Sequence, residues 1–170
     1  MSITKVTLQS PIEEKIAWAE VFYRKFGENL LKDKTITLLL YKLKNAISVS
    51  RKEMKAIGIT DICRECEQLD GGSCCGAGLE NKYNGSLILI NLLLNVKLPR
   101  KRYNPESCLF LGKTGCSLMS RHVICVNYVC KKITDRIDPR KIISLREKEG
   151  EELNTLFLLH ERINSCQVKG

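Results

Sequence analysis

Eight of the nine cysteines in this 170-residue chain fall between positions 63 and 130. Their order is a C-x2-C pair, an adjacent C-C pair after a gap of seven residues, and then four single cysteines. A thiolate is a soft anionic donor that suits zinc, copper(I) and iron–sulfur clusters. We therefore predict that these residues form the ligand pool of a metal centre: Cys63, Cys66, Cys74, Cys75, Cys108, Cys116, Cys125 and Cys130. The ninth, Cys166, is far from the others in sequence and is left out of the predicted site.

The redox state expected for these thiols follows from the rest of the chain. Residues 1–9 lack the apolar stretch and the small-residue cleavage site of a secretory signal peptide. The longest apolar run, residues 87–94, is interrupted by Asn91 and is too short to span a bilayer. We therefore expect a cytoplasmic protein, in which thiols stay reduced. An odd number of cysteines also prevents complete internal disulfide pairing, which favours metal ligation over a disulfide scaffold or inert thiols.

The chain has a large positive net charge, part of which metal-bound thiolates would offset. The chain has 28 Lys and Arg residues against 19 Asp and Glu residues, which gives a formal net charge of +9. Such a surplus is compatible with a nucleic-acid partner. Four thiolates around Zn²⁺ or a [4Fe–4S]²⁺ cluster carry a net charge of about −2, so two such centres would lower the total to about +5. Part of the surplus is thus expected to compensate an anionic centre, and the charge is weak support for nucleic-acid binding.

The apolar pattern predicts a mostly α-helical fold in a single domain that spans residues 1–170. Helices are expected over residues 1–60 and again over residues 138–166. Between them, residues 61–132 contain eight of the cysteines and are predicted to form a loop-dominated metal-binding core. The predicted architecture is therefore a small helical domain around a cysteine-rich centre.

Two amphipathic helices are predicted in the N-terminal region. The first should begin with Ser10 as its cap and Pro11 in its first turn, and should stop near Gly27. The second should begin at Asp33, and a short third helix is expected over residues 51–56. The predicted buried stripes are Ile12, Ile16, Ala19, Phe22, Tyr23 and Phe26 in the first helix, and Ile36, Leu39, Leu40, Leu43 and Ile47 in the second.

Three further helical segments are predicted after the first cysteines. One covers residues 86–95 with Ser86 as its cap, a loop follows over residues 100–113, and residues 118–133 have a helical pattern. The C-terminal helix should be capped by Asp138, and Gly150 is expected to weaken its middle. Its predicted buried stripe is Ile142, Leu145, Leu153, Leu156, Phe157 and Ile163.

The cysteine spacing limits how the thiols can share metal ions, but it does not determine how many metal centres they form. Cys63 and Cys66 are spaced to bind one ion across a tight turn. The side chains of the adjacent Cys74 and Cys75 diverge, so they suit two neighbouring sites or one polynuclear cluster. Eight thiolates can hold two four-cysteine centres, one larger cluster, or one centre beside reduced structural thiols, and the spacing leaves these alternatives open.

The order of the cysteines resembles the CxxCxxCC family, described as zinc- or iron-chelating domain proteins and often labelled iron–sulfur oxidoreductases. After the CxxC and CC pairs, the family continues with segments like C-P-F-L, G-x-C-x-I-Y and R-P-x-x-C. The corresponding segments here are C-L-F-L from Cys108, G-C-S-L-M from Gly115 and R-H-V-I-C from Arg121, with a last cysteine at Cys130. The resemblance covers about residues 60–132, which is under half of the chain.

This chain departs from the family pattern at several positions. The gap between the CxxC and CC pairs is longer, and Leu109, Met119 and His122 replace a proline, a tyrosine and a proline. These changes leave the number of thiol ligands unaltered, but they affect the loops that carry them. The resemblance implies one or two iron–sulfur clusters of the [4Fe–4S] type. It also implies a role in electron transfer or as a redox accessory, with a redox or enzyme protein as partner.

Two residues beside Cys125 are candidates for contacts with such a cofactor. Arg121 and His122 are expected to donate hydrogen bonds to sulfur and to offset its negative charge. The alternatives are a surface ion pair for Arg121 and a packed or solvated ring for His122.

The alternative cofactor is Zn²⁺, which would make the protein a zinc-stabilised binding module with a basic surface for nucleic acid or an acidic partner. Two basic runs would supply that surface: Lys97, Arg100, Lys101 and Arg102, then Lys131, Lys132, Arg136, Arg140 and Lys141. The sequence contains no P-loop, GxGxxG or HExxH motif. Any catalysis is therefore expected to reside in the metal centre or in a partner.

Overall fold

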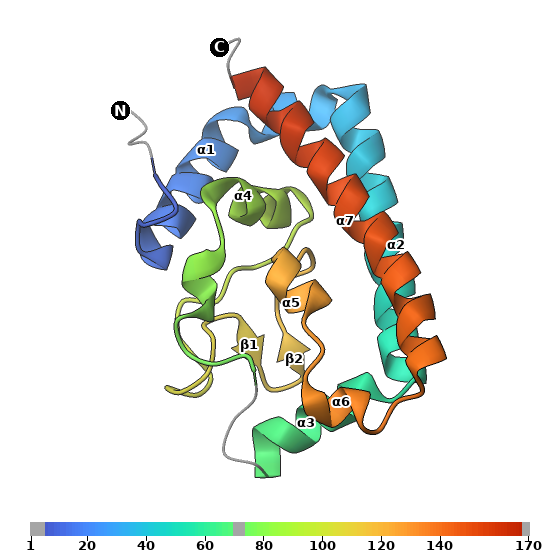
Figure 1. Cartoon of the computed structure of the whole chain (residues 1–170). Helices are drawn as coiled ribbons and strands as arrows, with labels where there is room; N and C mark the ends of the chain where they lie inside the picture. The colour runs from blue at the N-terminus through green and yellow to red at the C-terminus, as the bar shows by residue number, and fades with distance from the viewer. Residues whose placement is uncertain (1–5, 70–73, 168–170) are drawn as a thin grey trace.

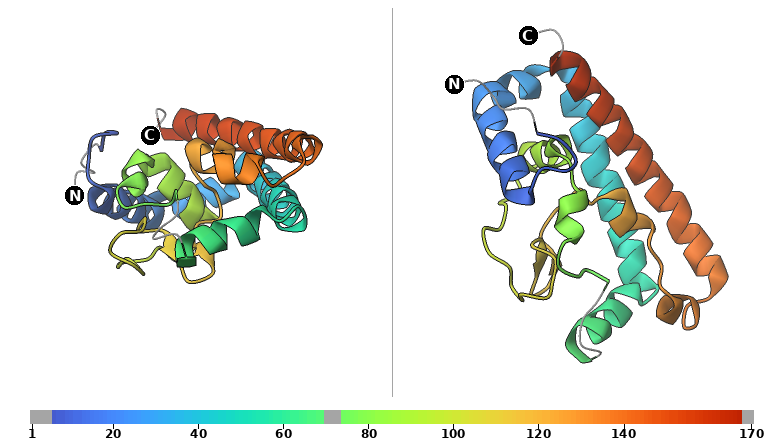
Figure 2. Two further views of the ribbon diagram at one scale, coloured as in Figure 1. Left: turned by 60° about the horizontal axis from the view of Figure 1, so that its bottom comes forward. Right: turned by 60° about the vertical axis from the view of Figure 1, so that its left-hand side comes forward.

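The computed structural model of the protein describes residues 6–69 and 74–167, which are mostly helical (Figure 1). The two longest helices, α2 (Lys34–Ala56) and α7 (Pro139–Gln167), lie side by side and antiparallel. Helix α1 (Ile12–Lys32) crosses near one end of this pair and packs on α4 (Gly85–Leu93). Helices α3 (Ile59–Leu69) and α6 (Lys131–Thr134) lie together at the opposite end, as Figure 2 also shows.

The first helix differs from its prediction at both ends. Its N-cap is Pro11, and no side chain caps it, because the Ser10 hydroxyl accepts a hydrogen bond from the Thr7 amide instead (3.2 Å). Gly27 does not end the helix. It is buried under the ring of Tyr23, where a Cβ would lie 2.9 Å from the ring atom Cδ2. The glycine is therefore explained by close packing within the helix and not by a helix stop.

Helix α2 begins where the sequence predicts. The carboxylate of Asp33 accepts hydrogen bonds from the amides of Thr35 (2.9 Å) and Ile36 (3.0 Å). The separate helix predicted over residues 51–56 is wrong, because α2 runs through these residues without a break. The next helix is α3, which begins after Gly58, a residue with a φ of 89° that strongly favours glycine.

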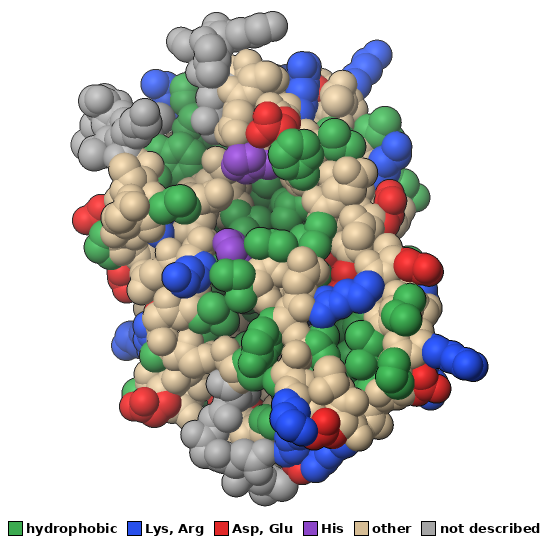
Figure 3. All heavy atoms as spheres, viewed as in Figure 1, with side chains coloured by type: hydrophobic (Ala, Val, Ile, Leu, Met, Phe, Trp, Pro, Cys, Tyr) green, Lys and Arg blue, Asp and Glu red, His purple; other side chains and the backbone are tan. Residues whose placement is uncertain are grey.

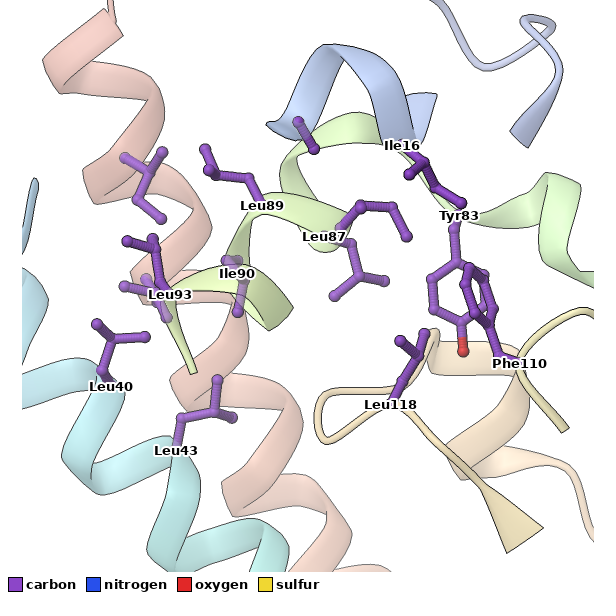
Figure 4. Packing of buried hydrophobic residues seen from close by; sticks show 14 of the residues in the cluster. Ile16, Leu40, Leu43, Tyr83, Leu87, Leu89, Ile90, Leu93, Phe110 and Leu118 are labelled. Carbon is purple, nitrogen blue, oxygen red and sulfur yellow. The ribbon is translucent and has the colours of Figure 1, made fainter. Parts of the chain in front are cut away.

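Helix α4 lies in the middle of the fold and is buried on almost all sides. Its cap is Asn84, whose side chain accepts a hydrogen bond from the Leu87 amide (2.8 Å), and not Ser86 as the sequence suggested. Figure 4 shows its apolar side chains directed at residues of α1, α2 and the segment near position 118. We call this cluster the main core; its fully buried members include Ala19, Ile36, Leu43, Ile88, Leu89, Ile90, Leu118, Leu159 and Ile163.

The segment between α4 and α7 is mainly irregular. A two-residue strand β1 (Leu111–Gly112) pairs antiparallel with β2 (Gly115–Cys116). The first strand lies within the loop predicted over residues 100–113, and the second lies just after it. The continuous helix predicted over residues 118–133 is wrong. Two short helices, α5 (Val123–Asn127) and α6, take its place, with Tyr128 and Cys130 in extended conformations between them. A single turn of 3-10 helix, η1 (Leu79–Lys82), precedes α4.

The start of α7 agrees with the prediction, since the Asp138 carboxylate accepts a hydrogen bond from the Arg140 amide (2.8 Å). The helix passes Gly150 without a break. The predicted burial of Phe157 is wrong, because 61% of this residue is exposed. The buried face of α7 includes Glu149 and Glu152, which interrupt the apolar pattern in the sequence.

A second, smaller core lies where α3, α6 and the start of α7 meet. Its buried members are Ile59, Ile62, Ile133 and Leu145. No helix in the described part of the chain is both long and apolar enough to cross a membrane.

Candidate metal centre

All nine cysteines lie in the described residues and are free thiols. The structure divides the eight predicted ligands between two places in the fold. We call Cys63, Cys66, Cys74 and Cys130 the α3–α6 group. We call Cys75, Cys108, Cys116 and Cys125 the core group, because all four pack in or against the main core.

The α3–α6 group joins segments that are far apart in sequence. Cys63 and Cys66 lie about one turn apart on α3, so the tight turn predicted for this pair is wrong. Cys130 is the N-cap of α6 and packs against the second core, to which α3 contributes Ile59 and Ile62. Packing of α3 on α6 thus places the last of the eight cysteines beside the first two.

The thiols of the α3–α6 group influence each other's ionisation. Partial desolvation by the surrounding protein raises the pKa of Cys63, although the residue is exposed, and Cys130, Cys74 and Cys66 raise it further. The pKa of Cys74 is raised in the same way, first by desolvation and then by Cys130. These charge effects between the thiols indicate that the four side chains lie in the same region of the fold.

The core group begins with two cysteines that face each other across a backbone pairing. Gly76 and Ser107 form an antiparallel bridge, and the Cys108 amide donates a hydrogen bond to the Cys75 carbonyl (2.7 Å). Residues opposite each other in an antiparallel pair project their side chains to the same face. Cys75 and Cys108 are therefore held side by side, although 32 residues lie between them.

Cys116 and Cys125 complete the core group from β2 and α5. Burial raises the pKa of Cys108 to about 12, and the neighbouring Glu80 carboxylate and Cys116 thiol add to the effect. Burial also raises the pKa of Cys116, and Cys125 contributes to the increase. Cys125 thus raises the pKa of Cys116, and Cys116 raises the pKa of Cys108.

Tyr83 is a buried neighbour of the core group that the sequence did not reveal. Its hydroxyl donates a hydrogen bond to Cys125 Sγ (3.7 Å), and only 1% of the residue is exposed. Its ring packs edge-on against Phe110 with the ring centroids 5.0 Å apart, and Figure 4 shows this pair beside Leu118. Burial raises the pKa of the phenol, and the thiols of Cys116 and Cys125 raise it further, so Tyr83 stays protonated as a donor.

The charge of Arg121 acts on one thiol of each group, and its predicted hydrogen bond to sulfur stays a prediction. Its positive charge lowers the pKa of Cys63 in the α3–α6 group and of Cys116 in the core group, in both cases against the larger effect of burial. Its Nη2 donates to the sulfur of Met54 (3.5 Å). The buried Nε of Arg121 has no hydrogen-bond acceptor among the described residues. A buried donor of this kind is available to an anion between the two groups.

Arg51 is a second guanidinium near Cys116 that sequence reasoning missed. Its Nη2 donates to the carbonyls of Leu118 (2.5 Å) and Met119 (3.0 Å), just after Cys116 in the chain. Burial lowers the pKa of Arg51, and so does the neighbouring Arg121, while Cys116 acts in the opposite direction. The helical pattern of α2 gave no sign of this role, because Arg51 reaches the site from 65 residues away in sequence.

His122 acts in the structure as a helix cap. Its Nδ1 accepts a hydrogen bond from the Ile124 amide at the start of α5 (3.2 Å), and its ring lies 5.6 Å from that of Tyr83. Burial lowers its pKa, with a contribution from Lys82. It therefore helps to orient the helix that carries Cys125, and its predicted hydrogen bond to sulfur stays a prediction.

The donor set suits a soft metal, but the thiols do not yet converge on one. Among residues 6–69 and 74–167, no three His, Cys, Asp or Glu side chains lie in an arrangement that could hold a metal ion. The pKa values of Cys63, Cys74, Cys108 and Cys116 are raised, so at neutral pH a metal would have to displace protons as it binds. The thiols, the two guanidiniums and the unpaired Nε fit an anionic thiolate centre.

Comparisons of the chain with protein-family models, with curated proteins and with solved structures gave no match. The resemblance to the CxxCxxCC family therefore rests on the cysteine pattern alone.

Proposed function

We propose that the protein is a cysteine-ligated iron–sulfur protein of the [4Fe–4S] type that acts in electron transfer or as a redox accessory to an enzyme system. The observation that carries this proposal is the gathering of eight free thiols into two groups of four, with Arg121 close to both. Neither group of four contains a histidine, and all-thiolate ligation is the rule for [4Fe–4S] clusters. When bound, such a cluster supplies one-electron transfer.

Different residues of the chain would bind this cofactor and adjust its charge and reduction potential. The eight cysteines would be the ligands. Arg51 and Arg121 would offset the charge of the thiolates, and Tyr83 would donate its hydrogen bond to one ligand sulfur. The apolar side chains around Phe110 would keep water away from the core group.

The proposal is tested by purifying the protein without oxygen, recording its visible spectrum and counting iron, sulfide and zinc in the same sample. A brown protein with matching iron and sulfide is expected. Replacement of Cys63 and Cys66 by serine should lower the iron content, whereas Cys166→Ser, on α7 outside both groups, should leave it unchanged. A protein that binds neither iron nor zinc would refute the proposal.

The alternative is a structural zinc protein, which would be colourless and carry stoichiometric zinc. A basic surface for nucleic acid belongs to that alternative. On the face shown in Figure 3, however, Lys and Arg side chains are spread out with Asp and Glu side chains among them. We therefore favour a protein partner in the cytoplasm over a nucleic acid. Nucleic-acid binding that weakens steeply with salt would reverse this preference.

A further inference from the structure

We propose that the two groups are two separate four-thiol centres, and that the α3–α6 centre is the one that exchanges with the surroundings. This inference rests on the proposed function, since it assumes that the thiols bind metal. It excludes a single eight-thiol cluster and a single centre beside structural thiols. It applies equally whether the metal is iron or zinc.

The adjacent cysteines are the first place where the chain separates the two centres. Cys74 is exposed and interacts with Cys130 and Cys66. Cys75 is part of the core group, and its carbonyl is fixed by the Cys108 amide (2.7 Å). The adjacent residues Cys74 and Cys75 thus supply one ligand to each centre. This agrees with the divergence of neighbouring side chains, which disfavours binding of both sulfur atoms to one ion.

The second separation lies between Cys125 and Cys130. Cys125 is on α5 and packs against the main core, where it accepts the hydrogen bond from Tyr83. The chain then leaves α5 in an extended conformation at Tyr128, and Cys130 packs against the second core. The two cysteines therefore belong to different apolar clusters, although only four residues lie between them.

Arg121 makes two neighbouring anionic centres compatible. Two four-thiolate centres would each carry a net charge of about −2 and would repel each other. The positive charge of Arg121 lowers the pKa of Cys63 in one group and of Cys116 in the other, against the larger effect of burial. Its buried Nε still lacks an acceptor among the described residues, so an N–H donor remains there for an anionic group.

Exposure distinguishes the two centres. In the α3–α6 group Cys63 and Cys74 are exposed and Cys66 and Cys130 are partly buried, whereas in the core group Cys108 is buried and the other three members are partly buried. A chelator or a redox partner therefore reaches the α3–α6 centre directly. The core centre is more shielded, because Cys108 and the neighbouring Tyr83 and Phe110 are buried.

The test is to remove one centre and count the metal that remains. We would measure metal per chain in the Cys63→Ser/Cys130→Ser variant, which alters cysteines 67 residues apart, and in Cys166→Ser as the matched control. The inference predicts that the double variant keeps about half of the wild-type metal and that the control keeps all of it. Loss of all the metal from the double variant, with its helix content preserved, would indicate one shared cluster. Retention of all the metal would show that the α3–α6 group binds none.

A second measurement on the wild-type protein does not depend on variants that fold. Metal release to a chelator in excess should occur in two phases of equal amplitude, and only the slow phase should remain in the double variant. A single phase would overturn the inference and leave the proposed function intact. Wild-type protein without any metal would instead refute the proposed function itself.

Discussion

At the scale of single residues, Glu80 connects the acid–base chemistry of the chain to its cysteines. Its fully buried carboxylate forms an ion pair with Arg102 and accepts hydrogen bonds from the amides of Gly78 (3.1 Å) and Leu109 (3.3 Å). It also raises the pKa of Cys108, after the larger effect of burial. The same carboxylate therefore anchors the segment that carries Cys108 and adds to the burial that keeps this thiol protonated.

We predict that Glu80→Gln destabilises the protein by about 1.5–3 kcal/mol at neutral pH, because the variant loses hydrogen bonds to a buried charge. Burial alone would raise the pKa of Glu80, but the bonds from Arg102 and the Leu109 amide outweigh burial and hold it below the ordinary value of 4.5. Because folding lowers the pKa of Glu80, its ionised carboxylate stabilises the folded protein fully above pH 4.5. This stabilisation is lost as the pH falls through the pKa that Glu80 has in the folded state. Urea unfolding should therefore show the difference between wild type and variant shrinking in acid. A difference that does not change with pH would contradict this account, and Glu106→Gln, at an exposed residue, is the control.

Tyr83→Phe removes only the hydroxyl that donates to Cys125 Sγ. We expect the metal-free variant to fold with a loss of about 1 kcal/mol, typical of one hydrogen bond. If the protein carries the proposed cluster, the loss of a hydrogen bond to sulfur should lower the reduction potential of that cluster. Voltammetry of both proteins measures this shift, with Tyr41→Phe on the exposed face of α2 as the control. An unchanged potential would mean that the hydroxyl does not act on the centre.

At the scale of elements, regular apolar spacing made some helices predictable. The start and the buried stripe of helix α2 were predicted, because Asp33 caps it and its residues from Ile36 to Ile47 face the main core, but its continuation through residues 51–56 was not. Helix α3 was missed because it is short and mainly polar, so its cysteines suggested a turn. In α7 the buried Glu149 and Glu152 hid the true face, because their partners, Arg146 for the first and Ser50 for the second, could not be known from the sequence.

The Asp33 cap also joins two elements, since its carboxylate pairs with Arg162 of α7 (2.5 Å). We predict that Asp33→Ala costs about 1 kcal/mol, the usual value of a helix N-cap. Asp33→Asn should cost less than about 1 kcal/mol, because asparagine still caps the helix and only a partly exposed ion pair is lost. Chemical denaturation of both variants measures the difference. Equal losses would show that the ion pair, and not the cap, carries the effect.

At the scale of the whole molecule, the fold has one large core and one small one. The core group of cysteines packs with the large core, and Cys130 of the α3–α6 group packs against the small one. The sequence predicted the eight thiols as a pool, but not their division. That division depends on α3 packing against α6 and on residues 75–77 pairing with residues 106–108, which are contacts between distant segments. The roles of Arg51 and Tyr83 were hidden for the same reason.

The two cores should differ in local stability. We predict that in the metal-free protein the amides of α3 and α6 exchange with deuterium at least about tenfold faster than those of α4, because few buried residues hold the second core. Addition of metal should slow exchange in α3 and α6 and change α4 much less. Hydrogen exchange read by mass spectrometry resolves the segments. Uniform protection across the chain would contradict the division into two cores.

Helix α7 follows all eight of these cysteines in the chain, yet it contributes Leu145 to one core and Leu159 and Ile163 to the other. It also holds α5 in place, because Arg146 donates to the carbonyls of Val126 (3.3 Å) and Asn127. During translation the complete set of thiols leaves the ribosome before α7 does. The nascent protein thus passes through a stage in which all eight predicted ligands are present and α7, which holds α5 and contributes to both cores, has not yet been made. At this stage Cys108, which is buried in the finished protein, is open to a metal donor.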